Sequence, residues 1–285
     1  MAFDGATFLL QWATGGLLFL WVTTRRREVS LGYGWLMRGT YAAMAVGAAY
    51  VGLRVIDTVA VRDLASVGVA VAALAALAVS VVRKDAGVSG QKELVEARSA
   101  RVAAMTGIDR APAAKDETAK EFPPALDLIA PVIGTIGIIG SGVVDGSPVW
   151  LAVTRLLVGA AFLGAVTDAM LLGHWYLVQP GMARGPLLEL IRWTFALWIP
   201  EVLLWLVPVG MVSALNGTID DGYGGLLGWF WLACAVTTGG LLVVTRLALR
   251  ERAYSAVMAA TGLLYLAILT AFGLDLVARA LLSGH

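Results

Sequence analysis

Residues 149–178 read VWLAVTRLLVGAAFLGAVTDAMLLGHWYLV, and this stretch decides the fold. About 20 apolar residues in a helix cross the hydrocarbon core of a bilayer, because each residue adds about 1.5 Å. The stretch is longer than that, so we expect a helix that tilts or projects from the bilayer. Its residues do not alternate between polar and apolar, which excludes a strand of a membrane barrel.

The rest of the chain repeats this pattern. Its 285 residues are 59% hydrophobic and 14% charged, whereas a soluble domain has about 25% charged residues. The mean hydropathy is +0.80. The sequence therefore predicts an all-α, polytopic transmembrane helix bundle with about eight spans, forming a single integral-membrane domain over 1–285. The spans are 6–23, 38–56, 64–82, 125–144, 149–178, 186–212, 225–249 and 254–282.

The lysines and arginines predict the orientation. Arg25, Arg26 and Arg27 follow the first apolar run instead of preceding it, so the run is read as a retained span and not as a signal peptide. Most of the 21 basic residues lie in every second connection between the spans. An excess of lysine and arginine is typical of cytoplasmic connections. Both termini are then outside. Segment 83–124 is a cytoplasmic connector between spans 3 and 4, with a helix expected over 89–105.

The composition also bounds location and partners. A chain of this kind belongs in the cell membrane, and its Ala-, Gly-, Val- and Arg-rich composition indicates a bacterial source. The lipid bilayer is the expected environment. Since extramembrane mass is almost absent, other protein subunits are expected partners. The net charge of +1 and the lack of a basic cluster point away from nucleic acid.

The turn QPGMARGP (179–186) is short, so the spans on either side of it must be antiparallel neighbours. His174 then lies at about the same depth in the inner leaflet as Glu189 and Arg192, with Tyr176 nearby. An imidazole, a hydroxyl, charges and apolar access are what a quinone headgroup requires. We expect His174 and Tyr176 to contact a quinone and Glu189 and Arg192 to set the local charge.

Two acids lie deeper in the predicted bilayer. Asp168 is on the fifth span, and Glu201 follows Pro200 on the sixth. Ionisable residues at this depth are costly and often belong to proton relays. Asp168 is the candidate partner of Glu201, and we expect the two to relay protons. The alternative is that each simply makes an interhelical hydrogen bond.

Other features predict packing. Asp275 and Arg279 are four residues apart on one helix face, and with Arg155 they are expected to form a structural clamp near the outer surface. Small residues let helix backbones approach closely in lipid. Gly134, Gly137 and Gly140 are such residues in the fourth span. They are joined by Ala161, Ala165 and Ala169 in the fifth and by Ala43/Gly47, Ala45/Ala49 and Ala48/Gly52 in the second.

Haem and metal sites receive less support from the sequence. A haem on His174 would need a second ligand, and His285 lies on the opposite side of the membrane in the predicted topology. Met170, Met182 or a residue of another subunit would have to supply it. No His, Cys and carboxylate group has the spacing of a metal site. The single cysteine, Cys234, cannot form an intrachain disulfide.

The sequence lacks a P-loop, a dinucleotide-binding glycine motif and a nucleophile elbow, so a hydrolase or NTP-driven pump is not expected. An eight-helix anchor without a bis-histidine haem resembles, in architecture alone, the quinone-interacting membrane subunits of respiratory oxidoreductases. Three hypotheses follow. The first is a membrane subunit of a multi-subunit redox complex, with a quinone as the expected cofactor. The others are a structural or assembly subunit without a ligand and a proton-coupled transporter with a midplane carboxylate site.

Overall fold

The computed structural model describes residues 4–86, 92–107, 119–145, 148–179, 181–251 and 253–282. Throughout these ranges the regular elements are helices and no β-strand is present, so the predicted all-α class is confirmed. The elements are α1 (Gly5–Thr24), α2 (Leu31–Arg54), α3 (Ala60–Val82), α4 (Lys92–Thr106), η1 (Pro124–Leu128), α5 (Ile129–Asp145), α6 (Val149–Val178), α7 (Gly185–Leu206), α8 (Gly210–Leu215), α9 (Leu226–Ala248) and α10 (Tyr254–Leu282).

Six helical segments in the described ranges are long and apolar enough to cross a membrane. They are α1, α3, η1 with α5, α6, α9 and α10. This indicates a multi-pass membrane protein in a lipid bilayer. Helices α2 and α7 have 24 and 22 residues, which is long enough to span, but α2 is less apolar and α7 carries three charged residues, Glu189, Arg192 and Glu201. The predicted count of eight spans therefore stays a prediction for these two helices.

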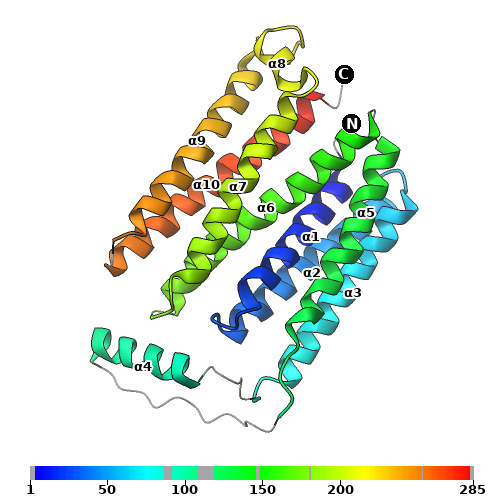
Figure 1. Cartoon of the computed structure of the whole chain (residues 1–285). Helices are drawn as coiled ribbons and strands as arrows, with labels where there is room; N and C mark the ends of the chain where they lie inside the picture. Colours follow the sequence, from blue (N-terminus) through cyan, green and yellow to red (C-terminus); the bar gives the residue numbers. More distant parts are fainter. Residues whose placement is uncertain are drawn as a thin grey trace.

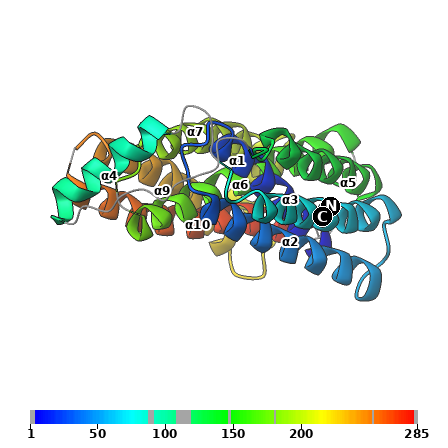
Figure 2. The same cartoon turned by 90° about the horizontal axis from the view of Figure 1, so that it is seen from below.

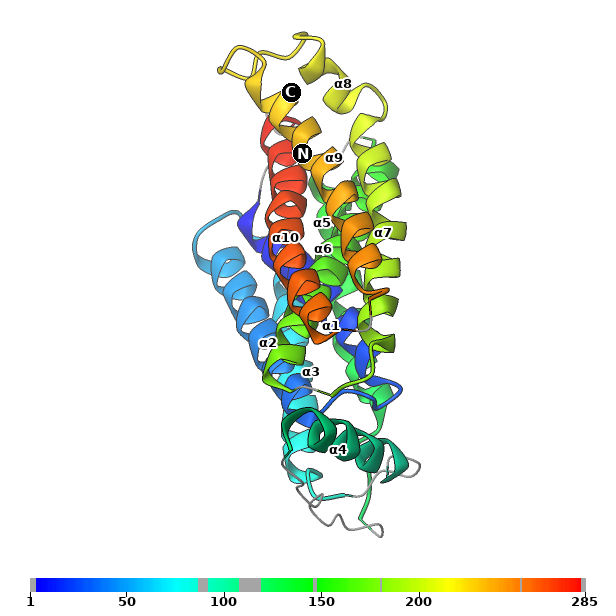
Figure 3. The same ribbon diagram turned by 90° about the vertical axis from the view of Figure 1, so that its left-hand side faces the viewer.

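The long helices run side by side, and α4 lies across one end of the bundle (Figures 1 and 3). We name this end the α4 end. Helix α8, the start of α1 and the end of α10 are at the opposite end, the α8 end (Figure 1). Seen along the bundle, α1 and α6 are central (Figure 2). Helices α2, α3 and α5 pack on one side of them, and α7, α9 and α10 pack on the other.

Glycine allows the two central helices to touch backbone to backbone. A Cβ atom placed on Gly15 of α1 would lie 1.7 Å from the carbonyl oxygen of Ala160 on α6. A Cβ atom on Gly164 would lie 2.1 Å from the carbonyl carbon of Gly15. Only glycine fits at either position. Sequence analysis did not single out this pair, although both residues lie in apolar runs where small residues mark close helix contacts.

The glycines predicted to pack in the fourth span do so. Cβ atoms added to Gly134, Gly137 and Gly140 of α5 would meet side chains of α1 and α3 within 3 Å. The nearest atoms belong to Thr14, Ala65 and Val61, respectively. Helix α5 is thus held against α1 and α3 by the absence of side chains at these three positions.

Helix α7 ends at Leu206, before the predicted limit of 212. Val207 is extended, with φ −97° and ψ 144°, because the residue before a proline is disfavoured in helical geometry and Pro208 follows. Arg155 of α6 binds the freed carbonyl groups: its Nε donates to Leu204 O at 3.0 Å, and its Nη2 donates to Val207 O. Arg155 thus holds helices together as expected, but it does so through backbone oxygens and not through a carboxylate.

The described part of the 83–124 connector contacts the α4 end of the bundle. Its helix covers 92–106, close to the expected 89–105; residues 89–91 lie outside the described ranges. Arg101 Nε donates to Gly181 O at 3.0 Å, in the turn that joins α6 to α7. Further along, Glu121 pairs with Arg27, and its carbonyl oxygen accepts from Arg83. The connector therefore has defined contacts on both sides of the central helices.

Candidate functional site

One buried acid is held between α6 and α2. The side chain of Asp168 is fully buried, and its Oδ1 accepts a hydrogen bond from the Tyr41 hydroxyl. The hydroxyl of Tyr33 donates to the Asp168 backbone oxygen at 3.3 Å. Asp168 Oδ2 has no hydrogen-bond partner among the described residues. We call Asp168, Tyr41 and Tyr33 the Asp168 centre.

A second buried acid lies on α7. Glu201 is 1% exposed, and its Oε1 accepts from Trp205 Nε1 at 2.7 Å, one helical turn further along. Glu201 Oε2 also lacks a hydrogen-bond partner in the described part of the chain. The guanidinium groups of Arg155 and Arg279 lie 4.8 and 5.8 Å from the centroid of the Trp205 ring. Such cation–π contacts are attractive, most strongly away from water.

Helix α10 completes this second cluster. Asp275 accepts two hydrogen bonds from Arg279, at 2.7 and 2.9 Å, so the pair predicted from their spacing is confirmed. Arg279 connects this pair to Glu201, because its guanidinium lies against the ring of Trp205, which donates to Glu201. Gln11 of α1 approaches from the other side: its Nε2, Asp275 Oδ1 and Arg279 Nη2 all lie within 3.1–3.4 Å of the position that a Cβ on Gly159 would take. We call this group the Glu201 centre.

The structure shows no hydrogen bond between Asp168 and Glu201, since one oxygen of each acid is bonded elsewhere and the other has no partner among the described residues. The two acids are on neighbouring helices, as expected, but they face different partners. Asp168 bonds Tyr41 of α2, whereas Glu201 bonds Trp205 of its own helix, whose ring lies against Arg155 and Arg279. Sequence separation places residues along a helix, whereas packing of the whole bundle decides which way each helix is turned.

The four residues expected around a quinone do not converge. His174 is exposed on the surface of α6, where its Nδ1 lies 3.2 Å from the Tyr265 hydroxyl of α10. Tyr176 is buried and donates to Ala183 O, closing the turn into α7. Arg192 is exposed, and its Nε donates to Leu188 O at 3.2 Å within its own helix.

Glu189, the fourth, is held by arginines of the first connection. It pairs with Arg25 at 2.5 Å and Arg26 at 3.2 Å. In the sequence these arginines indicated orientation only, yet they fix the start of α7 to the end of α1. Glu189 and Arg192 therefore do not act together as a pair. Of the haem alternatives, His285 lies outside the described residues.

Several residues of the two centres were missed by sequence reasoning. Tyr33 and Tyr41 are eight residues apart on α2, a spacing that puts both on one helix face and could have drawn attention. Trp205 lies four residues after Glu201, within reach of a local hydrogen bond. Gln11 is a single polar residue in an apolar run, and a lone glutamine in such a run does not by itself indicate a site.

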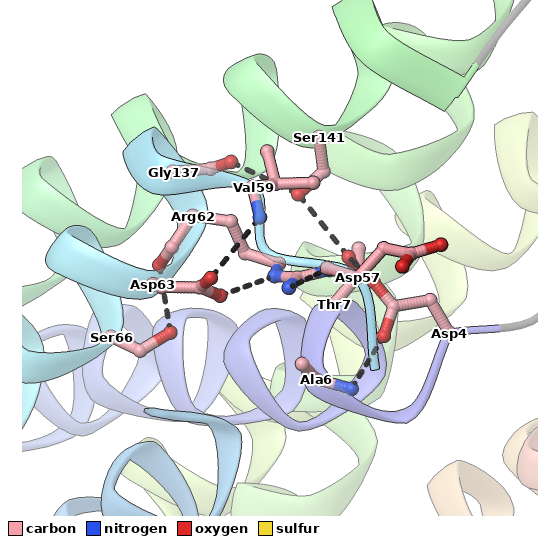
Figure 4. Close-up of polar contacts among 10 residues, drawn as sticks. All are labelled: Asp4, Ala6, Thr7, Asp57, Val59, Arg62, Asp63, Ser66, Gly137 and Ser141. Carbon is pink, nitrogen blue, oxygen red and sulfur yellow. Dashed lines mark hydrogen bonds and ion pairs between the residues drawn. The ribbon is translucent and has the colours of Figure 1, made fainter. Parts of the chain in front are cut away.

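Ion pairs at the two ends of the bundle are more fully satisfied. At the α8 end, Arg62 is 1% exposed and bonds Asp63 at 2.7 Å, Asp4, and the carbonyl of Asp57 at 3.1 Å (Figure 4). Towards the α4 end, Arg38 binds both oxygens of Asp127 at 2.7 Å. Because these charges are paired, they hold helices together, whereas the Asp168 and Glu201 centres are among the described groups that keep unused hydrogen-bonding capacity.

In the described ranges no three His, Cys, Asp or Glu side chains are grouped as metal ligands would be. Comparison of the chain with known family models, curated proteins and solved structures finds no match, so the two buried centres are interpreted from their own chemistry.

Proposed function

We propose that this protein transfers protons through its membrane bundle, with Asp168 and Glu201 as the groups that accept and release them. One observation carries the proposal. Four buried acceptor oxygens in the described chain lack a hydrogen-bond partner, and two of them belong to carboxyl groups: Gln11 Oε1, Thr14 Oγ1, Asp168 Oδ2 and Glu201 Oε2. A buried polar atom without a partner is costly, so it usually marks a bound water or a proton.

Helix α1 links the two centres. Gln11 borders the Glu201 centre, and Gly16 lies against the Tyr41 ring, which belongs to the Asp168 centre. Five residues of helix separate them, a rise of about 7.5 Å. Thr14 is between, with its hydroxyl unpaired. That hydroxyl lies against Gly134 of α5, and because a hydroxyl both donates and accepts, Thr14 can take part in proton transfer along α1.

We expect Glu201→Gln and Asp168→Asn each to lower the proton flux, because an amide cannot release a proton at any working pH. The flux is measured in proteoliposomes that contain a pH-sensitive dye. A potassium gradient across the membrane, with valinomycin added, drives the protons. A side chain that transfers protons commonly contributes about 100-fold or more to a rate, so a loss of that size is expected.

Glu96→Gln is the matched control, because Glu96 is an exposed carboxylate on α4, outside the bundle. It should leave the flux unchanged. Wild-type flux in both Glu201→Gln and Asp168→Asn would remove the proposal. So would a wild-type flux no greater than that of protein-free liposomes, and the paired charges would then favour the assembly subunit.

The contact of His174 with Tyr265 favours a second candidate function, the membrane subunit of a quinone-linked redox complex. Both side chains are exposed, and His174 is four residues from the end of α6, about 6 Å along the helix. Two apolar residues of the same helix as Tyr265, Met258 and Leu266, are exposed as well. An imidazole and a phenol facing lipid offer hydrogen bonds to a quinone carbonyl whose tail stays in the bilayer.

We expect quinone to copurify with the wild-type protein and to fall about tenfold in His174→Ala, the effect of losing a hydrogen bond of ordinary net strength. Mass spectrometry of an organic extract measures it, and an unrelated membrane protein corrects for free quinone. Tyr265→Phe is measured in the same way. Its control is Tyr50→Phe, because Tyr50 is an exposed tyrosine on another helix, α2. Equal quinone in all four proteins would exclude this site.

We also propose that all eight long helices span the cell membrane of a bacterium, with both termini outside. The start of α1 and the end of α10 lie at the same end of the bundle, which supports an even number of crossings (Figure 1). In a Cys234→Ser background, Thr218→Cys should react with a membrane-impermeant maleimide on intact cells, whereas Lys120→Cys should react only after lysis. Both residues are exposed, at opposite ends of the bundle. Labelling of both on intact cells would contradict this topology.

A further inference from the structure

We propose that the α4 end of the bundle binds the phosphate of an anionic lipid, held by Arg98 and Arg101 of α4 beside the turn that joins α6 to α7. The site is independent of proton transfer, since none of its residues belongs to the Asp168 or Glu201 centre. It requires only that α6 cross the bilayer, which the length and apolar sequence of this helix indicate.

Helix α4 rests on this turn at a glycine. Gly181 has a φ of +84°, a conformation that favours glycine. A Cβ placed on it would lie 2.9 Å from Val102 Cγ2 and 3.6 Å from Arg98 Cγ. Arg101 Nε donates to Gly181 O at 3.0 Å. Arg98, Arg101 and Val102 therefore share the face of α4 that is turned towards the bundle, as their spacing of three and four residues allows.

The two arginines bring positive charge together without an anion. Residues three apart on a helix are neighbours, so the side chains of Arg98 and Arg101 are adjacent. A guanidinium carries several N–H donors, and in these two only Arg101 Nε has an acceptor in the described chain. Arg98 is partly buried, and its burial and the Arg101 charge both lower the pKa of its guanidinium. Such a like-charge pair is stabilised by an anion that both members reach.

Two other charged residues at this turn leave the pair uncompensated. Arg184 donates to backbone oxygens at the end of α9 and just after it. Glu28 lies on the α7 side of the turn, where its Oε2 is 3.5 Å from the position that a Cβ on Gly185 would take. No carboxylate of the described chain forms an ion pair with Arg98 or Arg101, so their charge is open to a ligand.

The position of the pair identifies the anion as a lipid headgroup. Helix α6 has 30 residues, a length of about 45 Å, which is close to the thickness of a bilayer including its headgroups. The turn after α6 therefore lies in the headgroup layer, and α4 lies across the end of the bundle at the same level (Figures 1 and 3). A phosphodiester offers paired oxygens that match the planar guanidinium. An anionic lipid presents this charge alone, whereas the choline of phosphatidylcholine offsets it.

Native mass spectrometry of the delipidated full-length protein in mild detergent tests the site, with phosphatidylglycerol and phosphatidylcholine as probes. The wild-type protein should prefer phosphatidylglycerol. Arg98→Gln should weaken that binding about tenfold, the effect of losing a charge-assisted hydrogen bond. Arg98→Lys should keep part of it, because lysine retains the charge without the planar fork. Arg250→Gln is the control and should bind as the wild type does, because Arg250 is exposed just after α9, whose end Arg184 ties to the same turn.

Three results would overturn the proposal. Equal weakening in Arg98→Gln and Arg250→Gln would mean a diffuse positive surface instead of a site. Equal binding of the two lipids to the wild-type protein would remove the headgroup preference, and this result needs no variant to fold. Inorganic phosphate is the probe for a soluble anion. If it raises the wild-type unfolding temperature as much as phosphatidylglycerol does at the same concentration, the assignment to a lipid is wrong.

The unfolding temperature also separates a binding role of Arg98 from a structural one. Without added lipid, Arg98→Gln should unfold at the wild-type temperature or above it, because one of two like charges is gone. With phosphatidylglycerol, the wild type should gain more than the variant, since a ligand stabilises the state that binds it. A variant that is less stable without lipid and gains as much from the lipid would show that Arg98 only holds α4 in place.

Discussion

Gly15→Val should prevent the close packing of α1 on α6 and cause the largest loss of stability of any substitution considered for this protein. The added Cβ would lie 1.7 Å from a backbone oxygen of α6, a distance at which atoms cannot coexist. A clashing side chain can often rotate away, but the position of a Cβ atom is fixed by its own backbone, and the atom that it meets is a backbone oxygen. The helices must separate, and the contacts on both sides of them are lost. Overpacking typically costs about 1–3 kcal/mol, and a backbone clash at the centre should exceed that range.

The measurement is the yield of monodisperse protein in mild detergent and its midpoint of thermal unfolding. Gly240→Val is the matched control. Gly240 is in the middle of α9, and a Cβ placed there meets nothing within 4 Å. The control changes the same residue type in a helix of the same kind. Equal yield and equal midpoint for the two variants would show that α1 and α6 do not meet at Gly15.

Asp127→Ala should cost about 3–5 kcal/mol of unfolding free energy, the usual result of removing one member of a buried ion pair. Arg38 and Asp127 are 3% and 1% exposed, and both Asp127 oxygens accept from Arg38. Without the carboxylate, the guanidinium stays buried against the Phe122 ring, 4.5 Å from its centroid, with its charge unbalanced. The main cost is this unpaired charge, not the loss of an attraction.

That reasoning makes the double variant informative. Arg38→Met with Asp127→Leu removes both charges and should recover most of the loss, because hydrophobic residues of similar volume replace buried ion pairs at little cost. Asp220→Ala serves as the control, since Asp220 is exposed in the loop before α9. Unfolding in denaturant, followed by tryptophan fluorescence, measures all three. A double variant as unstable as Asp127→Ala would mean that the pair contributes specific attraction, contrary to this account.

The helices, the membrane environment and the contact of Asp275 with Arg279 could be predicted from the sequence, because each depends on residues that are close along the chain. Hydropathy sums over neighbours, and a pair four residues apart meets on one turn of helix. The end of α7 carried a local signal too, in Pro208. The predicted limit at 212 passed over it because the apolar run continues beyond the proline.

The partners of the buried acids could not be predicted in this way. Tyr41 is 127 residues from Asp168, and nothing along the chain connects them. His174 shares α6 with Asp168 but faces outward to Tyr265. Which face of a helix points inward depends on how it packs against every neighbour at once. Here α6 turns Gly164 towards α1 and Asp168 towards α2, and only the tertiary structure decides that rotation.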